Sequence, residues 1–275
     1  GHLSDGNAGI WVAAHLAEHY RAGAVFNEDH RLIDPLHYQI EATVRSKTLA
    51  AKVRTKFKAL VDGARVLPFD LYPTLRVNKV TDDQGRELKF IQEKHDEDSD
   101  FSVILAEGIA VGAEYALTFE YGGDEAVSDS GGGNFTLTAE ARANWYPNSS
   151  FLDRATYEMT FKTPKDYVMV ATGQPVGEAL EDDLVITRWK SEVPLAVAGF
   201  NYGKFQKYEL KDENLAYTIE TYANKEIPDV LKSIQKQAAA LEEAGIRTET
   251  SLATLNTVGM MDKVRAETQV AVALF

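Results

Sequence analysis

The sequence predicts a mainly β protein: an antiparallel, sandwich-like or saddle-shaped domain with a short N-terminal helix and C-terminal helices. Three observations lead to this prediction. From His37 onward, apolar and polar residues alternate, which is the period of a half-buried strand. Turn-forming residues such as Asp82-Asp83-Gln84-Gly85 separate the alternating stretches. After Asn224 the apolar residues recur at the spacing of an amphipathic helix.

The first two predicted strands, 37–45 and 51–61, show the alternation most clearly. In the first strand, the apolar positions share one face of the sheet. They are Tyr38, Ile40, Ala42 and Val44. In the second strand, every outward position from 52 to 58 carries a cation, and such a charged face discourages edge-to-edge aggregation. These cations are Lys52, Arg54, Lys56 and Lys58.

Further strands are predicted at short intervals, which indicates antiparallel sheets packed as a sandwich. They cover residues 66–72, 75–80, 88–92, 101–106, 115–121, 134–138, 156–163, 168–172, 184–190, 195–200 and 216–223. The glycine-rich residues 122–133 are predicted to form a mobile loop. No Lys-Ser/Thr pair and no helix follow these glycines, which argues against a phosphate-binding loop.

The helical patterns divide the chain into three parts. We expect a helical lead-in over 1–30, a β domain over 31–224 and the start of a following domain over 225–275. The lead-in contains an amphipathic helix over 8–22 with Asn7 as its cap.

In the last part, the pattern predicts a helix from Ile227 to Leu241, with Pro228 at its first turn and Gly245 beyond its end. Asp262 is expected to cap a final helix. The face of that helix is formed by Val264, Thr268, Ala271, Val272 and Phe275. Because this apolar stripe reaches the end of the chain, we expect the chain to be a fragment of a longer protein.

Composition and charge exclude several classes of function. The 275 residues are enough to bury a sizeable core, and the absence of cysteine excludes disulfides and thiol catalysis. A formal net charge of -13 disfavours nucleic acids and anionic membranes as partners. No apolar run approaches the roughly 20 residues that span a bilayer. The composition leaves the cellular compartment open.

Several short motifs occur in a specific order along the predicted strands. The first half contains Asp34-Pro35-Leu36-His37-Tyr38, Leu67-Pro68-Phe69-Asp70-Leu71 and an alternating strand from Glu114 to Tyr121. The second half contains Ala141-Arg142-Ala143-Asn144-Trp145-Tyr146-Pro147, Thr163-Pro164-Lys165-Asp166 and a strand from Pro194 to Phe200 followed by Gly203-Lys204-Phe205. With these motifs, residues 34–223 resemble the N-terminal β domain of the M1 family of aminopeptidase N-like zinc metallopeptidases.

This resemblance implies a non-catalytic domain that packs on a thermolysin-like catalytic domain and walls its cleft. The parent protein is then expected to bind zinc and peptide substrates. The family's Gly-x-Met-Glu-Asn and His-Glu-x-x-His motifs are absent from this sequence, so no catalytic residue, metal ligand or cofactor is expected in the chain itself. The alternative is a binding or scaffolding β module of an inactive peptidase relative.

Glu140 is the nearest candidate for the acidic or amide group that the family's N-terminal domain lends to the substrate's amino terminus. The sequence departs from the family just after this region. Residues 148–153, Asn-Ser-Ser-Phe-Leu-Asp, replace an acidic segment of the Trp-Asp-Glu-Pro type.

A separate hypothesis concerns His15-Leu16-Ala17-Glu18-His19, which has the His-x-x-Glu-His pattern of inverted zinc peptidases. Two histidines four residues apart on a helix can share a metal, but a third ligand on another helix is needed. The segments that follow are strands, so a solvated or partly packed helix is favoured. The remaining histidines, at positions 2, 30, 37 and 95, have no partner at ligand spacing.

Two other groups of residues are candidates for a function. Arg142, Trp145 and Tyr146 could lie near the substrate's entry, but packing of both aromatic rings on the sheet and an Arg142–carboxylate pair are favoured. The carboxylates Asp96, Glu97, Asp98 and Asp100 lack the alternating ligands and central glycine of a calcium loop. They are predicted to form a solvated loop.

Overall fold

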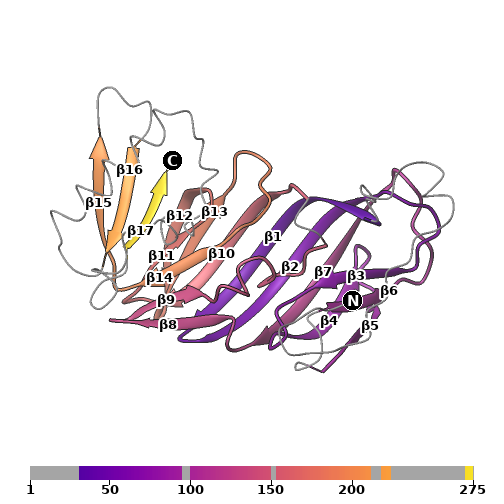
Figure 1. Cartoon of the computed structure of the whole chain (residues 1–275), viewed down its shortest axis with the longest axis horizontal. Helices are drawn as coiled ribbons and strands as arrows, with labels where there is room; N and C mark the ends of the chain where they lie inside the picture. Colours follow the sequence, from indigo (N-terminus) through magenta and orange to yellow (C-terminus); the bar gives the residue numbers. More distant parts are fainter. Residues whose placement is uncertain (1–30, 95–99, 150–152, 212–217, 224–269, 275) are drawn as a thin grey trace, which may run out of the picture. The chain divides into compact units, whose positions relative to one another are not determined.

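The computed structural model describes residues 31–94, 100–149, 153–211, 218–223 and 270–274. The described strands belong to one compact unit, which begins at Leu32. The predicted helices over 8–22 and 227–241 lie outside the described residues. What is described is mainly β and arranged in several sheets (Figure 1), as the sequence predicts.

The strands follow one another closely along the chain. Those of the first half are β1 (Ile33–Arg45), β2 (Thr48–Ala59), β3 (Val66–Asp70), β4 (Arg76–Asp82), β5 (Lys89–Gln92), β6 (Asp100–Ile104), β7 (Glu114–Gly123), β8 (Val127–Gly131) and β9 (Asn134–Leu137). Those of the second half are β10 (Thr156–Pro164), β11 (Val168–Ala171), β12 (Gln174–Glu181), β13 (Leu184–Lys190), β14 (Phe200–Gly203), β15 (Gln206–Lys211), β16 (Thr218–Ala223) and β17 (Val270–Leu274).

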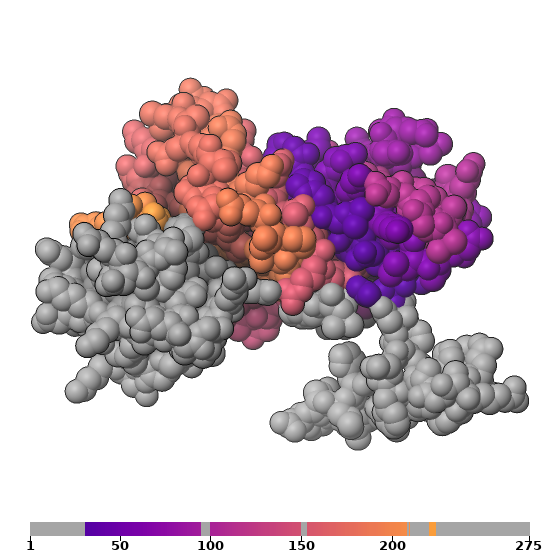
Figure 2. Space-filling view, turned by 90° about the horizontal axis from the view of Figure 1, so that it is seen from above, coloured from indigo at the N-terminus to yellow at the C-terminus, as the bar shows by residue number. Residues whose placement is uncertain are grey.

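The largest sheet has seven strands in the order β12-β13-β10-β1-β2-β7-β4. Its central pair, β1 and β10, is parallel, with Tyr38 opposite Tyr157 and Ala42 opposite Phe161. The prediction of antiparallel sheets holds for the other pairs of described strands but not for this one. A parallel pair needs a long connection between its strands, and β2 to β9 supply it. In Figure 2 the indigo surface of the first strands adjoins the salmon and orange surface of the later ones.

One face of this sheet is buried and the other is exposed and charged. Across the buried face, Tyr121, Ala51, Ala42 and Phe161 stand opposite one another on β7, β2, β1 and β10. Small residues at the centre of this row leave room for large side chains that come from the covering layer. On the exposed face two of the predicted cations of β2 pair with carboxylates of β7: Lys52 with Glu120 at 3.9 Å and Lys56 with Glu114 at 2.6 Å.

Two smaller sheets cover the buried face. One has the order β3-β6-β5, and its Phe69 and Phe101 pack edge-on against Phe119 of β7, with ring centroids 5.0 and 5.8 Å away. The other has the order β11-β14-β9-β8, and its Phe200 lies 5.0 Å from Phe161 of β10. These contacts form the layered core of a β-sandwich.

More than half of the stretch over 122–133, which was predicted to form a mobile loop, belongs to strands. Its first two residues end β7, residues 127–131 form β8, and 132–133 form the turn that leads into β9. The hairpin turn uses positive φ angles at Gly131 (86°) and Gly133 (81°), which glycine adopts without steric cost. The Asp129 carboxylate also accepts a 2.8 Å hydrogen bond from the Gly131 amide. The glycines of this low-complexity stretch thus serve the tight turn of the hairpin.

One further predicted strand is misplaced, and the last predicted helix is not confirmed. The strand expected over 195–200 begins only at Phe200, and Leu195 makes a single bridge with Ala155. The final helix expected from Asp262 is not confirmed, because the part of it that the structure describes, Val270–Leu274, is a strand paired with β16. Its Val-Ala-Val-Ala-Leu sequence suits a strand as well as a helix, and pairing with β16 decides between them.

Candidate functional site

The candidate substrate-binding residue Glu140 lies in an irregular segment between β9 and β10, residues 138–149. The segment begins as tight turns: the Ala141 amide donates to the Thr138 carbonyl at 3.2 Å, and the Asn144 amide donates to the Ala141 carbonyl at 3.1 Å. Glu140 is exposed within these turns and Arg142 is half-buried. The turns therefore present the Glu140 carboxylate to solvent.

Neither Glu140 nor Arg142 has a side-chain hydrogen bond or ion pair with any residue that the structure describes. The expected pair between Arg142 and a carboxylate is thus not found in this part of the chain. An exposed carboxylate without a partner stays available to accept hydrogen bonds from an incoming cation, such as an ammonium group.

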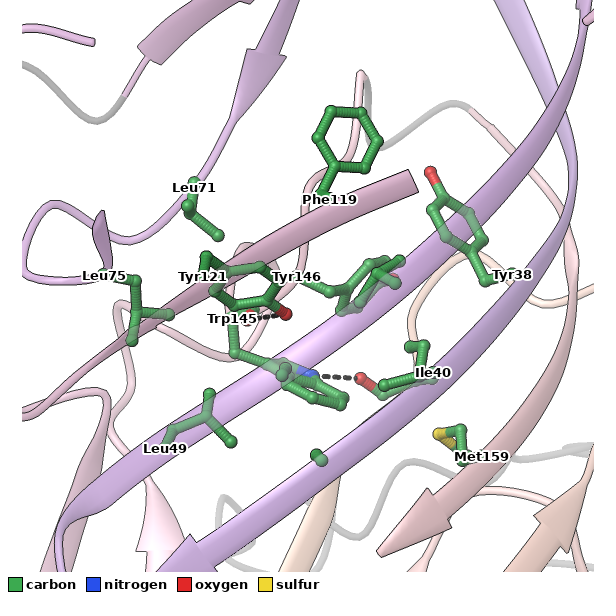
Figure 3. Packing of buried hydrophobic residues seen from close by; sticks show 14 of the residues in the cluster. Tyr38, Ile40, Leu49, Leu71, Leu75, Phe119, Tyr121, Trp145, Tyr146 and Met159 are labelled. Atoms are coloured by element: carbon green, nitrogen blue, oxygen red, sulfur yellow. Dashed lines mark hydrogen bonds between the residues drawn. The ribbon is translucent and has the colours of Figure 1, made fainter. Parts of the chain in front are cut away.

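The second half of the 138–149 segment is anchored in the core, as the packing interpretation of Trp145 and Tyr146 predicts. Both side chains are at most 1% exposed. The Trp145 indole N–H donates to the Ala198 carbonyl at 2.8 Å, and the Tyr121 hydroxyl donates to the Trp145 carbonyl at 2.9 Å (Figure 3). The Trp145 ring also packs edge-on against Phe200, 5.0 Å away.

The backbone of the segment is held against the end of β3 and the residues just after it. The Tyr72 amide donates to the Asn144 carbonyl at 2.7 Å, and Asp70 and Asn148 exchange two backbone hydrogen bonds of 2.8 and 3.2 Å. The Asn148 side chain donates to the Ala143 carbonyl at 2.6 Å, which closes the loop on itself. The later part of the segment is therefore fixed by backbone and side-chain hydrogen bonds, while its Glu140 end faces solvent.

Tyr146 belongs to a group of buried tyrosines that no sequence motif indicates. The hydroxyls of Tyr146 and Tyr157 are 3.0 Å apart, and the Tyr38 ring stacks on Tyr157 at 5.3 Å. Asp153 lies close enough to act on all three hydroxyls electrostatically, and it accepts a 2.5 Å hydrogen bond from Ser149. The only sequence signal for this group is that Tyr38 and Tyr157 fall on apolar positions of alternating strands.

These tyrosines cannot act as bases near neutral pH. Burial raises the pKa of the Tyr146 hydroxyl to about 12, and it raises the pKa values of Tyr38 and Tyr157 well above their usual range. Neutral hydroxyls that hydrogen-bond one another inside a core stabilise a unique packing arrangement. We therefore infer that these tyrosines have a structural role and hold the 138–149 segment in place.

Only one of the six histidines, His37, belongs to the described residues. It lies on the polar face of β1, as predicted, and its Nδ1 is 2.8 Å from the Thr156 hydroxyl. Burial lowers the pKa of His37, and the nearby Glu158 carboxylate partly opposes this by raising it. His37 is thus a neutral hydrogen-bonding partner of β10 at neutral pH.

No group of three or more metal-ligating side chains occurs within the described ranges. The His15, Glu18 and His19 set lies outside those ranges, as do His2, His30, His95 and the carboxylates at 96–98. The metal hypothesis for His15, Glu18 and His19 therefore stays a prediction. Likewise, no helix long and apolar enough to cross a membrane is found in the part of the chain that is described.

Comparisons with known proteins show which solved structures share this fold. No family model and no curated protein sequence matches the chain. Among solved structures, the M1 zinc metallopeptidase from Deinococcus radiodurans matches with a TM-score of 0.57 and 18% identity, over 70% of this chain and 47% of that chain. A point mutant of the Deinococcus radiodurans metallopeptidase bound to a Tyr-Ser-Ala substrate matches with a TM-score of 0.58 and 18% identity, over 68% and 46% of the two chains.

A further match is a mutant described as a two-domain M1 zinc metallopeptidase bound to L-arginine, with a TM-score of 0.58 and 19% identity, over 68% and 46% of the two chains. The chain therefore spans about half the length of the structures that it matches. The resemblance inferred from the sequence is confirmed at the level of the fold.

Proposed function

We propose that residues 31–224 form the non-catalytic N-terminal domain of an M1-like zinc aminopeptidase. In this proposal the domain packs on a catalytic domain and forms one wall of the cleft that receives the peptide. The observation that supports it most is the shared fold with M1 zinc metallopeptidase structures, at TM-scores of 0.57 and 0.58 over about half of their length. The order of the motifs around Arg142 and Pro147 supports the same assignment.

The chemistry of the parent protein would come from zinc, which polarises a peptide carbonyl and activates a water molecule for attack on it. The described residues contain no group that could hold such an ion. In this proposal the zinc ligands and the general base belong to the catalytic domain, and this chain contributes binding surface.

Within this proposal, Glu140 receives the positively charged amino terminus of the peptide. Its carboxylate is exposed, has no partner among the described residues and lies at the free end of a segment whose other end is fixed in the core. A carboxylate held in this way can orient an ammonium group without first breaking an ion pair of its own.

The proposal is tested with the native protein that contains this chain. Its coding sequence should continue beyond Phe275 into a His-Glu-x-x-His motif with a further glutamate on the next helix. The purified native protein should hold one zinc ion and hydrolyse aminoacyl reporters, with hydrolysis lost on chelation and restored by zinc. A native protein without this motif and without turnover would contradict the proposal and leave the binding or scaffolding role.

A further inference from the structure

The two edges of the seven-stranded sheet differ in how their backbone groups are satisfied. At the β4 edge, the chain itself provides the partners. The Gln92 side chain accepts from the Val77 amide and donates to the Leu75 carbonyl, both at 2.9 Å. The Leu88 amide donates to the Val80 carbonyl, also at 2.9 Å. This edge is closed to further strands.

The opposite edge of the sheet is β12, and no other described strand pairs with its outer side. Every residue from Pro175 to Glu181 is exposed, a pattern found in no other strand whose burial is described. The residues of β12 hydrogen-bond to β13, and no further hydrogen bond or ion pair of theirs occurs within the described residues. In an antiparallel pair, every second residue directs its N–H and C=O away from its partner. Within the described part of the chain, β12 therefore presents a row of backbone donors and acceptors without partners.

The side chains of β12 combine apolar and acidic character. Val176 and Leu180 are 60% and 68% exposed, which is high for aliphatic residues within a strand. A bulge between Pro175 and Gly177 disturbs the start of the strand, so its regular part runs from Gly177 to Glu181. Edge strands usually avoid such apolar exposure because it invites pairing with another chain.

The charge of this edge argues against pairing with a second copy. The carboxylates Glu178 and Glu181 lie on the strand, Asp182 and Asp183 follow in the turn, and no cation occurs between 178 and 183. An antiparallel pair of two β12 strands would bring these carboxylates together, which is destabilising across strands. The net charge of -13 adds a general repulsion between copies.

We propose that β12 accepts an extended segment of another protein as an added antiparallel strand, with basic residues opposite Glu178 and Glu181 and apolar residues between them. Because side chains alternate between faces, Glu178 and Leu180 share one face and Ala179 and Glu181 share the other. A partner strand reading Lys-Val-Val-Lys places its lysines opposite the two glutamates and a valine opposite Leu180. Backbone hydrogen bonds provide the affinity, and these side chains provide the selectivity.

The test measures binding of fluorescent hexapeptides to the 275-residue chain by anisotropy. The sequences Thr-Lys-Val-Val-Lys-Thr and Thr-Glu-Val-Val-Glu-Thr differ only in the charge of the residues opposite the glutamates. The lysine peptide should bind at least about tenfold more tightly, a difference of roughly 1.4 kcal/mol. It should also slow amide hydrogen exchange within 174–181. Equal affinities, or protection elsewhere in the chain, would overturn the proposal.

Three variants make the test specific to β12. The double substitution Glu178→Lys with Glu181→Lys should reverse the preference, so that the glutamate peptide binds more tightly. Leu180→Lys should weaken binding of the lysine peptide. Val111→Lys is the matched control, because Val111 is similarly exposed (61%) but lies outside β12, and it should leave binding unchanged. A dimer that Leu180→Lys dissociates would instead identify a second copy as the occupant and overturn the proposal.

Discussion

The hydroxyl of Tyr121 donates a 2.9 Å hydrogen bond to the backbone carbonyl of Trp145, a residue outside every sheet. The indole of Trp145 in turn donates to the Ala198 carbonyl, just before β14. Through these two bonds, Trp145 links β7 of the large sheet to the approach to β14 of a covering sheet. The same contacts set the position of the 138–149 segment, and therefore of Glu140.

Removal of the Tyr121 hydroxyl should destabilise the fold. In Tyr121→Phe the buried Trp145 carbonyl loses this donor, and an unsatisfied buried acceptor costs about 1–3 kcal/mol. Urea unfolding followed by tryptophan fluorescence measures the loss. Tyr115→Phe is the control, because the Tyr115 hydroxyl accepts from the exposed Ala110 amide, which water can satisfy instead. Equal losses in the two variants would contradict the assigned role of Tyr121.

Truncation of Trp145 should have a larger effect. The side chain is fully buried and packs against Tyr146 and Phe200. Trp145→Ala should lower the free energy of unfolding by about 3–5 kcal/mol, because it leaves a cavity as well as an unpaired carbonyl. A loss below about 1 kcal/mol, within the range of ordinary surface substitutions, would show that the segment is not anchored through this residue.

Substitution of Glu140 should separate function from stability. Because the side chain is exposed and has no partner among the described residues, Glu140→Gln should change stability by less than about 0.5 kcal/mol. In the active native protein the same change should raise KM for substrates with a free amino terminus. Acetylated substrates provide the comparison, since they lack the ammonium group. If Glu140→Gln left KM for free-amino substrates unchanged, Glu140 would have no role in binding.

The titration of His37 should respond in opposite directions to two neighbouring substitutions. Burial lowers the pKa of His37 below its ordinary value of about 6.5. Glu158→Gln should lower this pKa further, because Glu158 raises it. Lys190→Gln should raise it, because Lys190 lowers it directly and also pairs with Glu158 at 2.8 Å. The His37 ring protons, followed by NMR against pH, measure both shifts.

The same pKa shift has a consequence for stability. The unfolded chain binds a proton at His37 more readily than the folded chain, so stability falls as pH drops through the ordinary histidine range. His37→Gln should remove this part of the acid sensitivity. Shifts of the His37 pKa in the same direction in both neighbouring variants would contradict the assigned geometry.

The sequence predicted most of the strands because their signal is local. Strands β2 and β10, which alternate strictly, fall within three residues of their predicted bounds. The incorrect predictions concern features that are determined by contacts between distant parts of the chain. The parallel pairing of β1 with β10 depends on strands far apart in the chain, and β17 depends on pairing with β16. No local pattern carries that information.

The candidate site was predictable in part for the same reason. Trp145 and Tyr146 could be assigned to the core because large aromatic side chains at the end of a strand are usually buried. The rings of Tyr38, Tyr146 and Tyr157 come from three separate segments and pack against one another, so their proximity was not visible in the sequence. The absence of an Arg142 partner among the described residues likewise depends on the folded arrangement.

The most direct test of the central claim compares the peptidase activity of the 275-residue chain with that of the native protein that contains it. Both are assayed on aminoacyl reporters, with and without added zinc. We predict no turnover by the chain under either condition and zinc-dependent turnover by the native protein. Turnover by the purified chain that disappears with a chelator and returns with zinc would contradict the account, because it would place a catalytic metal within these residues.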